Sequence, residues 1–266
     1  MMKILVVDAF TSEPFSGNPA AVCLLPPEGR DDRWMQSLAA EMNLAETAFL
    51  APEGDAWRLR WFTPELEVNL CGHATLASAH ALGEWGLAGE PGELRFLTRS
   101  GVLRAVRLGA GIRIDLPADP AHPQPLPADI ARALGGPATV WTGASRANWL
   151  VCLPSDKAVQ DVAPDFRPLR AALLPSGFGV IVTSAADRPG VDFVSRYFAP
   201  AHGIDEDPVT GSAHCALAPY WSGRLGRTTL AARQISRRGG ALTVELAGER
   251  VLLTGRAVTV LRGEVG

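Results

Sequence analysis

Two segments headed by a glycine decide how the fold is interpreted. They read LCGHATLA at residues 70–77 and VTGSAHCA at residues 209–216, and their glycines are 211 − 72 = 139 positions apart. Small and apolar residues follow each glycine, as is typical of a helix that is buried nearly all round. The pattern predicts that the chain twice turns through a glycine into a central helix.

Other elements repeat in the same order around these helices. The strand, helix and strand patterns of residues 20–50 recur over residues 149–183, and alternating strands at 57–64 and 191–200 both end in proline. Seven elements thus recur at a nearly fixed offset, which indicates a duplicated α+β unit. The proline-rich residues 116–127 are the natural linker, so we expect an N-terminal lobe at residues 1–116 and a C-terminal lobe at residues 117–255.

Each lobe has many strands and few helices. A curled, mostly antiparallel sheet wrapped around the apolar central helix would bury that helix. We therefore expect two α+β lobes facing each other across a cleft, with the active site in the cleft.

Composition excludes several classes of function. The 25 Lys and Arg residues are balanced by 28 Asp and Glu residues without a basic run, which argues against nucleic-acid binding. No apolar run approaches the ~20 residues of a membrane helix, and the N-terminus lacks a signal-peptide core, so a cytoplasmic protein with no membrane partner is expected. The widely spaced Cys23, Cys71, Cys152 and Cys215 indicate buried thiols rather than a disulfide scaffold or a zinc ribbon.

The two helix starts are candidate anion sites. Backbone N–H groups and the positive end of the helix dipole favour a carboxylate there. Gly72-His73-Ala74 and Gly211-Ser212-Ala213 would therefore bind one small anionic ligand from both sides of the cleft. The alternative is that the glycines only permit a tight turn.

Glu46 is the leading acid/base candidate. It stands where a loop enters an apolar strand, and the repeat-related residues 176–179 contain no acid. A single acid/base group requires such a difference between the two repeats, with an acid in only one of them. The alternative is that Glu46 is simply a solvated glutamate at the end of a strand. Residues 205–207 are three acids that could simply cap the second helix, or Asp207 and His73 could hydrogen-bond a substrate or exchange protons with it.

Metal and two-thiol chemistry both lack a matching pattern. His73 and His80 are seven residues apart, so no metal site is expected, and no Gly-rich phosphate loop indicates an organic cofactor. A racemase with two thiols needs one on each side of the substrate carbon, whereas the repeat partner of Cys71 is Thr210. We therefore expect chemistry from side chains alone.

Five blocks of sequence carry a family resemblance. They are DAFT at 8–11, FSGNPAAV at 15–22, NLAETAF at 43–49, CGHAT at 71–75 and EDPVTGSA at 206–213. Together they resemble the signature of the PhzF family of phenazine biosynthesis isomerase-like proteins. The resemblance implies the duplicated fold of diaminopimelate epimerase, with the last strand, residues 256–266, returning to the first lobe.

The resemblance also implies a function. Glu46 would move a proton on the substrate carbon, and the substrate-binding residues would be Gly72, His73, Asp207, Gly211 and Ser212. In the phenazine enzyme the substrate is trans-2,3-dihydro-3-hydroxyanthranilate. We expect a cofactor-independent homodimeric isomerase of a small carboxylate-containing metabolite. The alternatives are an amino-acid racemase or epimerase of the related fold, and a non-catalytic metabolite-binding protein.

Overall fold

The computed structural model describes residues 1–89, 92–109 and 111–266, and the chain divides into two compact units. The first unit contains Met1–Leu116 and Leu252–Gly266, and the second contains Pro117–Val251. Strand β17 (Arg250–Gly255) carries the chain back into the first unit. Among the helices that the structure describes, none is both long and apolar enough to span a membrane.

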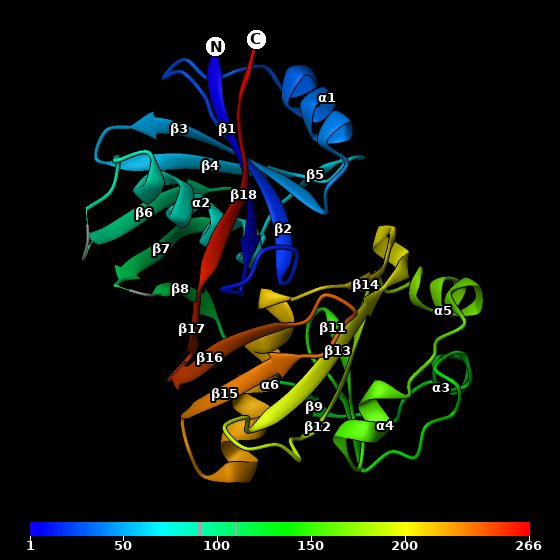
Figure 1. Ribbon diagram of the computed structural model, residues 1–266. Coiled ribbons are helices and arrows are strands. Elements are labelled where there is room, and N and C mark those ends of the chain that lie inside the picture. Colours follow the sequence, from blue (N-terminus) through cyan, green and yellow to red (C-terminus); the bar gives the residue numbers. More distant parts are fainter. Residues whose placement is uncertain (90–91, 110) are drawn as a thin grey trace. The chain divides into compact units, whose positions relative to one another are not determined.

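The first unit combines a mixed sheet with helices (Figure 1). Its elements are β1 (Met2–Ala9), β2 (Asn18–Leu24), α1 (Asp32–Met42), β3 (Glu46–Glu53), β4 (Ala56–Phe62), β5 (Glu67–Val68), α2 (Gly72–Glu84), β6 (Gly92–Thr98), β7 (Gly101–Leu108), β8 (Gly111–Pro117) and β18 (Ala257–Val265). Strands β2 and β3 pair in parallel, as do β4 and β6. The pairs β18–β1, β1–β2, β3–β4, β6–β7 and β7–β8 are antiparallel.

Helix α2 is the central helix of this unit. Ten of its thirteen residues are buried, and it packs against β1, β2, β3, β7 and β18. Its alanine-rich sequence suits this position because short side chains let strands approach on several sides.

Helix α1 covers the opposite face of the same sheet. Its N-cap residue Asp31 accepts a hydrogen bond from the Trp34 backbone N–H at 2.8 Å, which satisfies a donor that the helix itself leaves unpaired. Met35 of this helix packs in one cluster with Phe49 of β3 and Cys23 of β2. Strand β2 is therefore buried on both faces, as expected of a strand with a parallel neighbour.

The second unit repeats this topology. Its elements are β9 (His122–Pro123), α3 (Ala128–Ala133), β10 (Trp141–Ala144), β11 (Asn148–Cys152), α4 (Asp156–Gln160), α5 (Phe166–Leu173), β12 (Gly179–Ala185), β13 (Phe193–Ala199), the 3₁₀ turn η1 (Pro200–His202), β14 (Ile204–Asp207), α6 (Gly211–Leu225), β15 (Thr229–Gln234) and β16 (Gly240–Ala247). The pairings β10–β11–β12–β13–β15–β16 alternate antiparallel and parallel in the same order as β1–β2–β3–β4–β6–β7. The predicted α+β duplication is therefore confirmed.

The proline-rich linker contains more structure than the sequence suggests. Residues His122 and Pro123 form β9, which pairs antiparallel with β10 opposite Ala144 and Gly143. An edge strand of two residues tolerates a proline because the outer backbone N–H groups are not needed for pairing.

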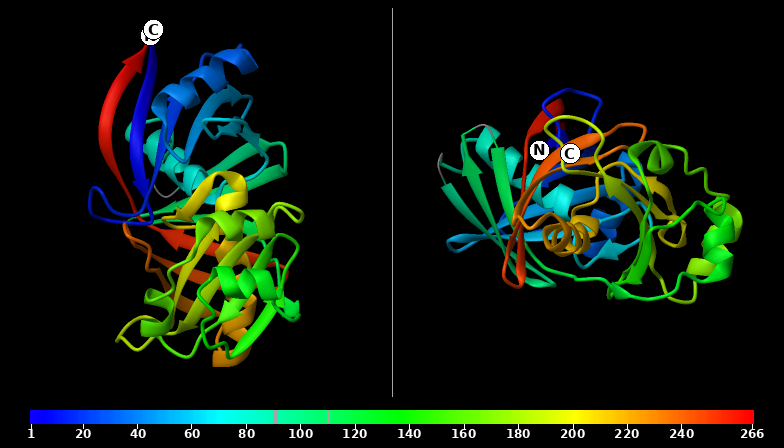
Figure 2. Two further views of the ribbon diagram at one scale, coloured as in Figure 1. Left: turned by 90° about the vertical axis from the view of Figure 1, so that its right-hand side faces the viewer. Right: turned by 90° about the horizontal axis from the view of Figure 1, so that it is seen from below.

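The first and last strands of the chain lie side by side. Strand β18 pairs with β1 from Ala257 opposite Ala9 to Val265 opposite Met2, with one irregularity after Val6. Both termini consequently lie at the same end of the first unit (Figures 1 and 2).

Candidate active site

Three elements of the first unit bring polar side chains to one place. Strand β3 begins at Glu46, and its parallel register sets Glu46 beside Ala20, two residues after Asn18 at the start of β2. Helix α2, which packs on both strands, begins at Gly72 and carries His73 in its first turn. Because parallel strands begin at the same edge of a sheet, the starts of β2 and β3 lie together beside the helix N-terminus.

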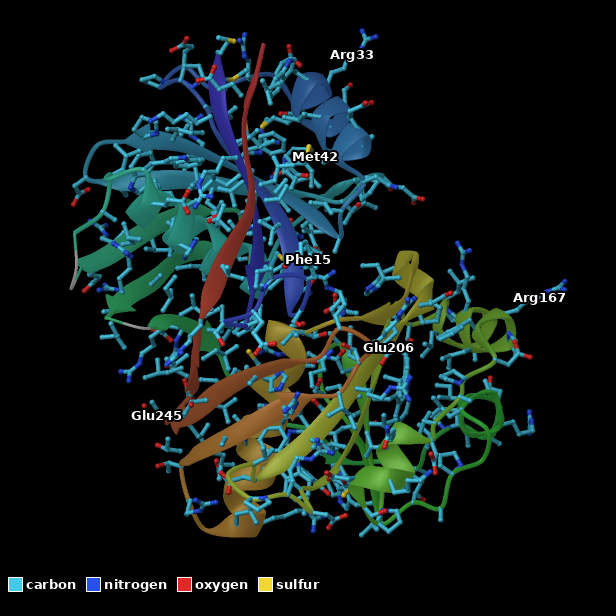
Figure 3. All side chains as sticks on the ribbon, viewed as in Figure 1. Phe15, Arg33, Met42, Arg167, Glu206 and Glu245 are labelled. Carbon is cyan, nitrogen blue, oxygen red and sulfur yellow. The ribbon has the colours of Figure 1, made fainter. Side chains whose placement is uncertain are left out.

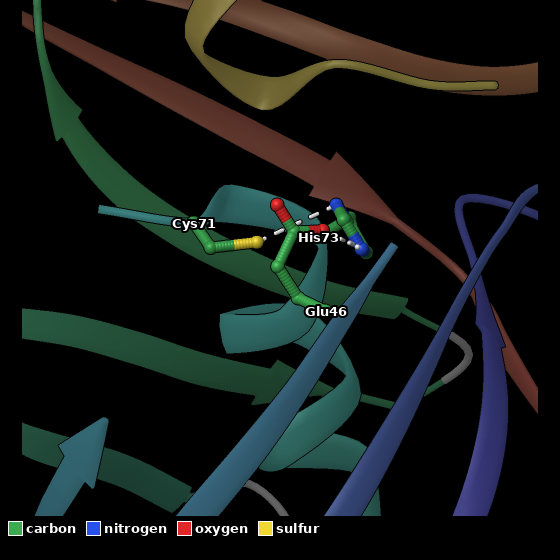
Figure 4. A group of neighbouring side chains, drawn as sticks. All are labelled: Glu46, Cys71 and His73. Atoms are coloured by element: carbon green, nitrogen blue, oxygen red, sulfur yellow. Dashed lines mark hydrogen bonds and ion pairs between the residues drawn. The ribbon is translucent and has the colours of Figure 1, made fainter. Parts of the chain in front are cut away.

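His73 is the centre of this cluster (Figure 4). Its Nε2 lies 3.2 Å from Oε2 of Glu46. On the other side of the ring, Nδ1 lies 3.1 Å from Nδ2 of Asn18 and 3.5 Å from Sγ of Cys71. The side chains of His73 and Glu46 are only 5% and 13% exposed, so the cluster is nearly enclosed while the carboxylate keeps a small opening.

Burial decides the charge of His73. It lowers the pKa of the imidazole to about 3, and a hydrogen bond to the Pro19 backbone carbonyl opposes it only in part. The ring is therefore neutral at physiological pH. The contact between Glu46 and His73 is therefore a close approach of a carboxylate to a neutral imidazole rather than an ion pair.

The same cluster offers potential metal ligands. One atom each of Glu46, Cys71 and His73 lie within 4.8 Å of one another, and this mixture of oxygen, sulfur and nitrogen would suit zinc. Two features oppose a cation there. The Asn18 amide group occupies the Nδ1 side of the ring, and the N-terminal end of a helix has a positive potential. These three residues come together although the sequence predicts no metal site. His80, which the sequence pairs with His73 at a spacing of seven residues, instead bonds Thr259 Oγ1 at 3.0 Å.

The remaining site candidates belong to the second unit. Asp207 ends β14 and accepts a hydrogen bond from the Thr210 hydroxyl, while Gln234 Nε2 donates to the Asp207 carbonyl at 2.7 Å. Gln234 Oε1 accepts from the Thr210 backbone N–H at 2.9 Å. Gly211 is buried and Ser212 is exposed in the first turn of α6.

Thr210 occupies the N-cap position of α6, as Cys71 does in α2. The helix starts are built alike in a further respect. Thr75 Oγ1 donates to the Cys71 carbonyl at 2.6 Å, and His214 Nδ1 bonds the Thr210 carbonyl at 2.7 Å. Each helix thus satisfies its N-cap carbonyl with the side chain four residues later.

A family model described as phenazine biosynthesis-like protein, PhzC-PhzF, matches residues 7–263. The chain belongs to this family. An uncharacterized isomerase of Halalkalibacterium halodurans is 47% identical over 98% of this chain and 97% of the relative. A solved PhzF-family structure from Enterococcus faecalis is 42% identical, with a TM-score of 0.93 over 100% of this chain and 99% of the other.

A more distant likeness concerns the fold alone. The structure of a probable proline racemase from Agrobacterium radiobacter is 14% identical, with a TM-score of 0.70 over 100% of this chain and 93% of that chain. The PhzF-family protein therefore has the duplicated α+β fold of the diaminopimelate epimerase type, as the sequence predicts.

Within this PhzF-family protein, sequence reasoning missed two residues that contact the site candidates. Asn18 appears in the sequence analysis only as part of the FSGNPAAV segment at residues 15–22, without a role of its own, and Gln234 does not appear there. A usable signal for Asn18 was its place at the start of a strand that the repeat reproduces at Asn148. For Gln234 the sequence offers no comparable signal, because its contacts with Asp207 and Thr210 depend on the pairing of β15 with β13.

Proposed function

We propose that this protein is a cofactor-independent isomerase that moves a proton on a small carboxylate-bearing substrate, with Glu46 as the acid/base group. The curated relatives that are 47% and 51% identical are both named uncharacterized isomerases, which supports the reaction class. The observation that carries the proposal is the carboxylate of Glu46, nearly enclosed and 3.2 Å from a neutral histidine.

A carboxylate in this setting can take a proton and return it. In the proposed reaction, Glu46 removes a proton from one substrate carbon as the electron pair moves into the conjugated system, and then delivers the proton to another carbon. Atoms and electrons balance within the substrate, and Glu46 ends in its starting state. The neutral imidazole of His73 lies 3.2 Å from the carboxylate and adds no positive charge that would hold Glu46 in its ionised form during either step.

The substrate carboxylate has a natural place at a helix start. We propose that the backbone N–H groups at Gly72 bind it, because the first turn of a helix favours an anion. On the second unit, Asp207, Gly211 and Ser212 are proposed substrate-binding residues on the strength of the family resemblance. We also propose a homodimer, which light scattering of the purified protein would test.

Solvent exchange tests the proposal before the natural substrate is known. The protein is incubated in D₂O with a panel of small unsaturated carboxylic acids, trans-2,3-dihydro-3-hydroxyanthranilate among them, and each acid is followed by NMR and mass spectrometry. We expect deuterium at one carbon and a shifted double bond in at least one acid. Dialysis against a chelator should leave the rate unchanged.

Glu46→Gln is the matched variant because it keeps the shape of the side chain and removes the proton acceptor. The rate should fall by roughly 10²–10⁴-fold, the usual contribution of general acid–base catalysis. Exchange at a stereocentre with inversion and no double-bond shift would indicate a racemase or epimerase instead. Binding without exchange across the panel, or full activity of Glu46→Gln, would refute the proposal.

A further inference from the structure

The carboxylate of Asp207 is held by a relay of hydrogen bonds in the second unit. Asp207 is the buried last residue of β14 and follows Glu206, which is labelled in Figure 3. Its Oδ2 accepts a hydrogen bond from the Thr210 hydroxyl. That hydroxyl oxygen accepts a hydrogen bond in turn from Nε2 of Gln234, at 3.2 Å. Gln234 is fully buried at the end of β15.

Two backbone groups determine the orientation of the Gln234 amide. Its Oε1 lies 2.9 Å from the Thr210 backbone N–H, which can only donate. Its Nε2 lies 2.7 Å from the Asp207 backbone carbonyl, which can only accept. Rotation of the amide by 180° would set donor against donor and acceptor against acceptor. Nε2 therefore keeps its second hydrogen for Thr210 Oγ1, and the hydroxyl hydrogen is directed at Asp207.

These hydrogen bonds serve two purposes. The bonds from Gln234 to the Thr210 N–H and the Asp207 carbonyl satisfy buried main-chain groups, as burial alone requires. The relay through the Thr210 hydroxyl instead ends on a side-chain oxygen, so it acts on the orientation of the Asp207 carboxylate.

The first unit shows that the acid and the amide occur together. The strand registers align Asp207 of β14 with Val68 of β5, and Gln234 of β15 with Thr98 of β6. Thr98 Oγ1 donates to the Gly101 carbonyl at 2.7 Å and so belongs to a local turn. The unit without an acid at this position thus also lacks the amide, which indicates that the amide accompanies the acid rather than the helix start.

We propose that Gln234 is a positioning residue that orients the Asp207 carboxylate for the substrate by way of the Thr210 hydroxyl. The amide hydrogen fixes the rotation of the hydroxyl, because Oγ1 accepts from Nε2 and directs its own hydrogen at Asp207 Oδ2. Without the amide, the hydroxyl can rotate away and the carboxylate loses a fixed partner. The relay follows from contacts within the second unit, and only its effect on substrate binding rests on the proposed function.

NMR of the isotope-labelled full-length protein tests the relay without a substrate. Three-bond couplings about the Cα–Cβ bond of Asp207 show whether its side chain occupies one rotamer, and Asp207→Asn identifies its signals. We expect one rotamer in the unaltered protein and averaged couplings in Gln234→Met and Thr210→Val. Thr210→Val leaves both backbone bonds of Gln234 in place, so it decides the question even if Gln234→Met does not fold. One rotamer in folded Thr210→Val would overturn the proposal.

Two further variants are matched controls. Thr210→Ser keeps the hydroxyl and should keep the single rotamer of Asp207. Ser236→Ala removes a 2.7 Å hydrogen bond to the Pro208 carbonyl, which belongs to the same turn but not to the relay. It should also leave the Asp207 couplings unchanged. Averaged couplings in Ser236→Ala would mean that any weakening of the turn frees Asp207, which would refute a specific role of the relay.

Substrate binding provides the second measurement once an exchanging acid has been found. Loss of a hydrogen bond to a charged group typically weakens an interaction by about tenfold or more, so Gln234→Met and Thr210→Val should raise KM by at least about tenfold. Thr210→Ser and Ser236→Ala should keep KM within about twofold. A merely structural role would reduce the amount of active enzyme, and with it the apparent kcat, at an unchanged KM.

The two proposals can fail separately. If Glu46→Gln keeps full activity while the Asp207 couplings respond as expected, the proposed function fails and the relay stands. If Glu46→Gln is inactive but Gln234→Met and Thr210→Val have an unchanged KM, the positioning role is refuted and the proposed function stands.

Discussion

Acid should destabilise the protein through two histidines that are buried without charge. Burial lowers the pKa of His214 to about 4, and that of His73 to about 3, from an ordinary value near 6.5. Between pH 6.5 and these values, the unfolded chain binds a proton at each position and the folded chain does not. The free energy of unfolding therefore decreases as the pH falls through this window, and neither histidine contributes to the change above pH 6.5.

The size of the effect follows from the width of the window. A pH of 5 is 1.5 units below the pKa of each histidine in the unfolded chain and still above its pKa in the folded protein. At 1.36 kcal/mol per unit, each histidine therefore lowers the free energy of unfolding by about 2 kcal/mol. Together they remove about 4 kcal/mol, a large part of the 5–15 kcal/mol typical of folded domains.

His214→Asn isolates one of the two contributions. Asparagine can still donate to the Thr210 carbonyl, as Nδ1 of His214 does, but it does not titrate. Urea unfolding at pH 7 and pH 5, followed by the fluorescence of the seven tryptophans, gives the loss of stability for each protein. The loss should be about 2 kcal/mol smaller in the variant, because the contributions of all carboxylates cancel in the comparison.

The exposed His122 provides the matched control, and His122→Asn should lose as much stability between pH 7 and pH 5 as the unaltered protein. An equal loss in His214→Asn and in the unaltered protein would refute the reasoning, because it would mean that His214 is protonated in the folded state at pH 5.

Three further outcomes are expected. Burial raises the pKa of the Cys23 thiol to about 12, so iodoacetamide at pH 8 should label Cys23 only after unfolding, as peptide mass spectrometry will show. Gly17→Ala should lower the free energy of unfolding by about 2 kcal/mol or more, since it combines a positive φ with a backbone clash. Gly54 also has a positive φ, +62°, but has open space around it, so Gly54→Ala should lower the free energy of unfolding by about 1–2 kcal/mol. Equal losses in the two variants, measured by urea unfolding, would contradict the clash at Gly17. Thr210→Val should destabilise by about 1–3 kcal/mol, because it removes the hydroxyl that donates to Asp207 and accepts from Gln234.

The sequence predicts those parts of the fold that depend on local patterns. A glycine followed by small apolar residues is sufficient to place the starts of α2 and α6 at Gly72 and Gly211, as observed. The alternating pattern from residue 57 likewise becomes β4. These elements are predictable because burial of one face of a strand, or of one stripe of a helix, sets the spacing at which apolar residues recur along the sequence.

Contacts between distant residues escape this kind of reasoning. Asn18 and His73 are 55 positions apart, and their contact depends on the register of β2 and on how α2 packs against it. Glu46 is recognisable as a polar residue at the start of an apolar strand, but its histidine partner is not. The short strand β9 was missed because prolines mark a linker more strongly than two residues mark a strand.

The pairing of β18 with β1 has a consequence for synthesis of the chain on the ribosome. The second unit is one continuous segment, Pro117–Val251, and all of it is made before β18. The first unit is begun first but has to wait, with one edge of β1 unpaired, until residues 257–265 emerge. Domains fold as units, so a released chain truncated after Gly255 is expected to fold its second unit, while β1, which lacks its partner β18, stays open to proteases.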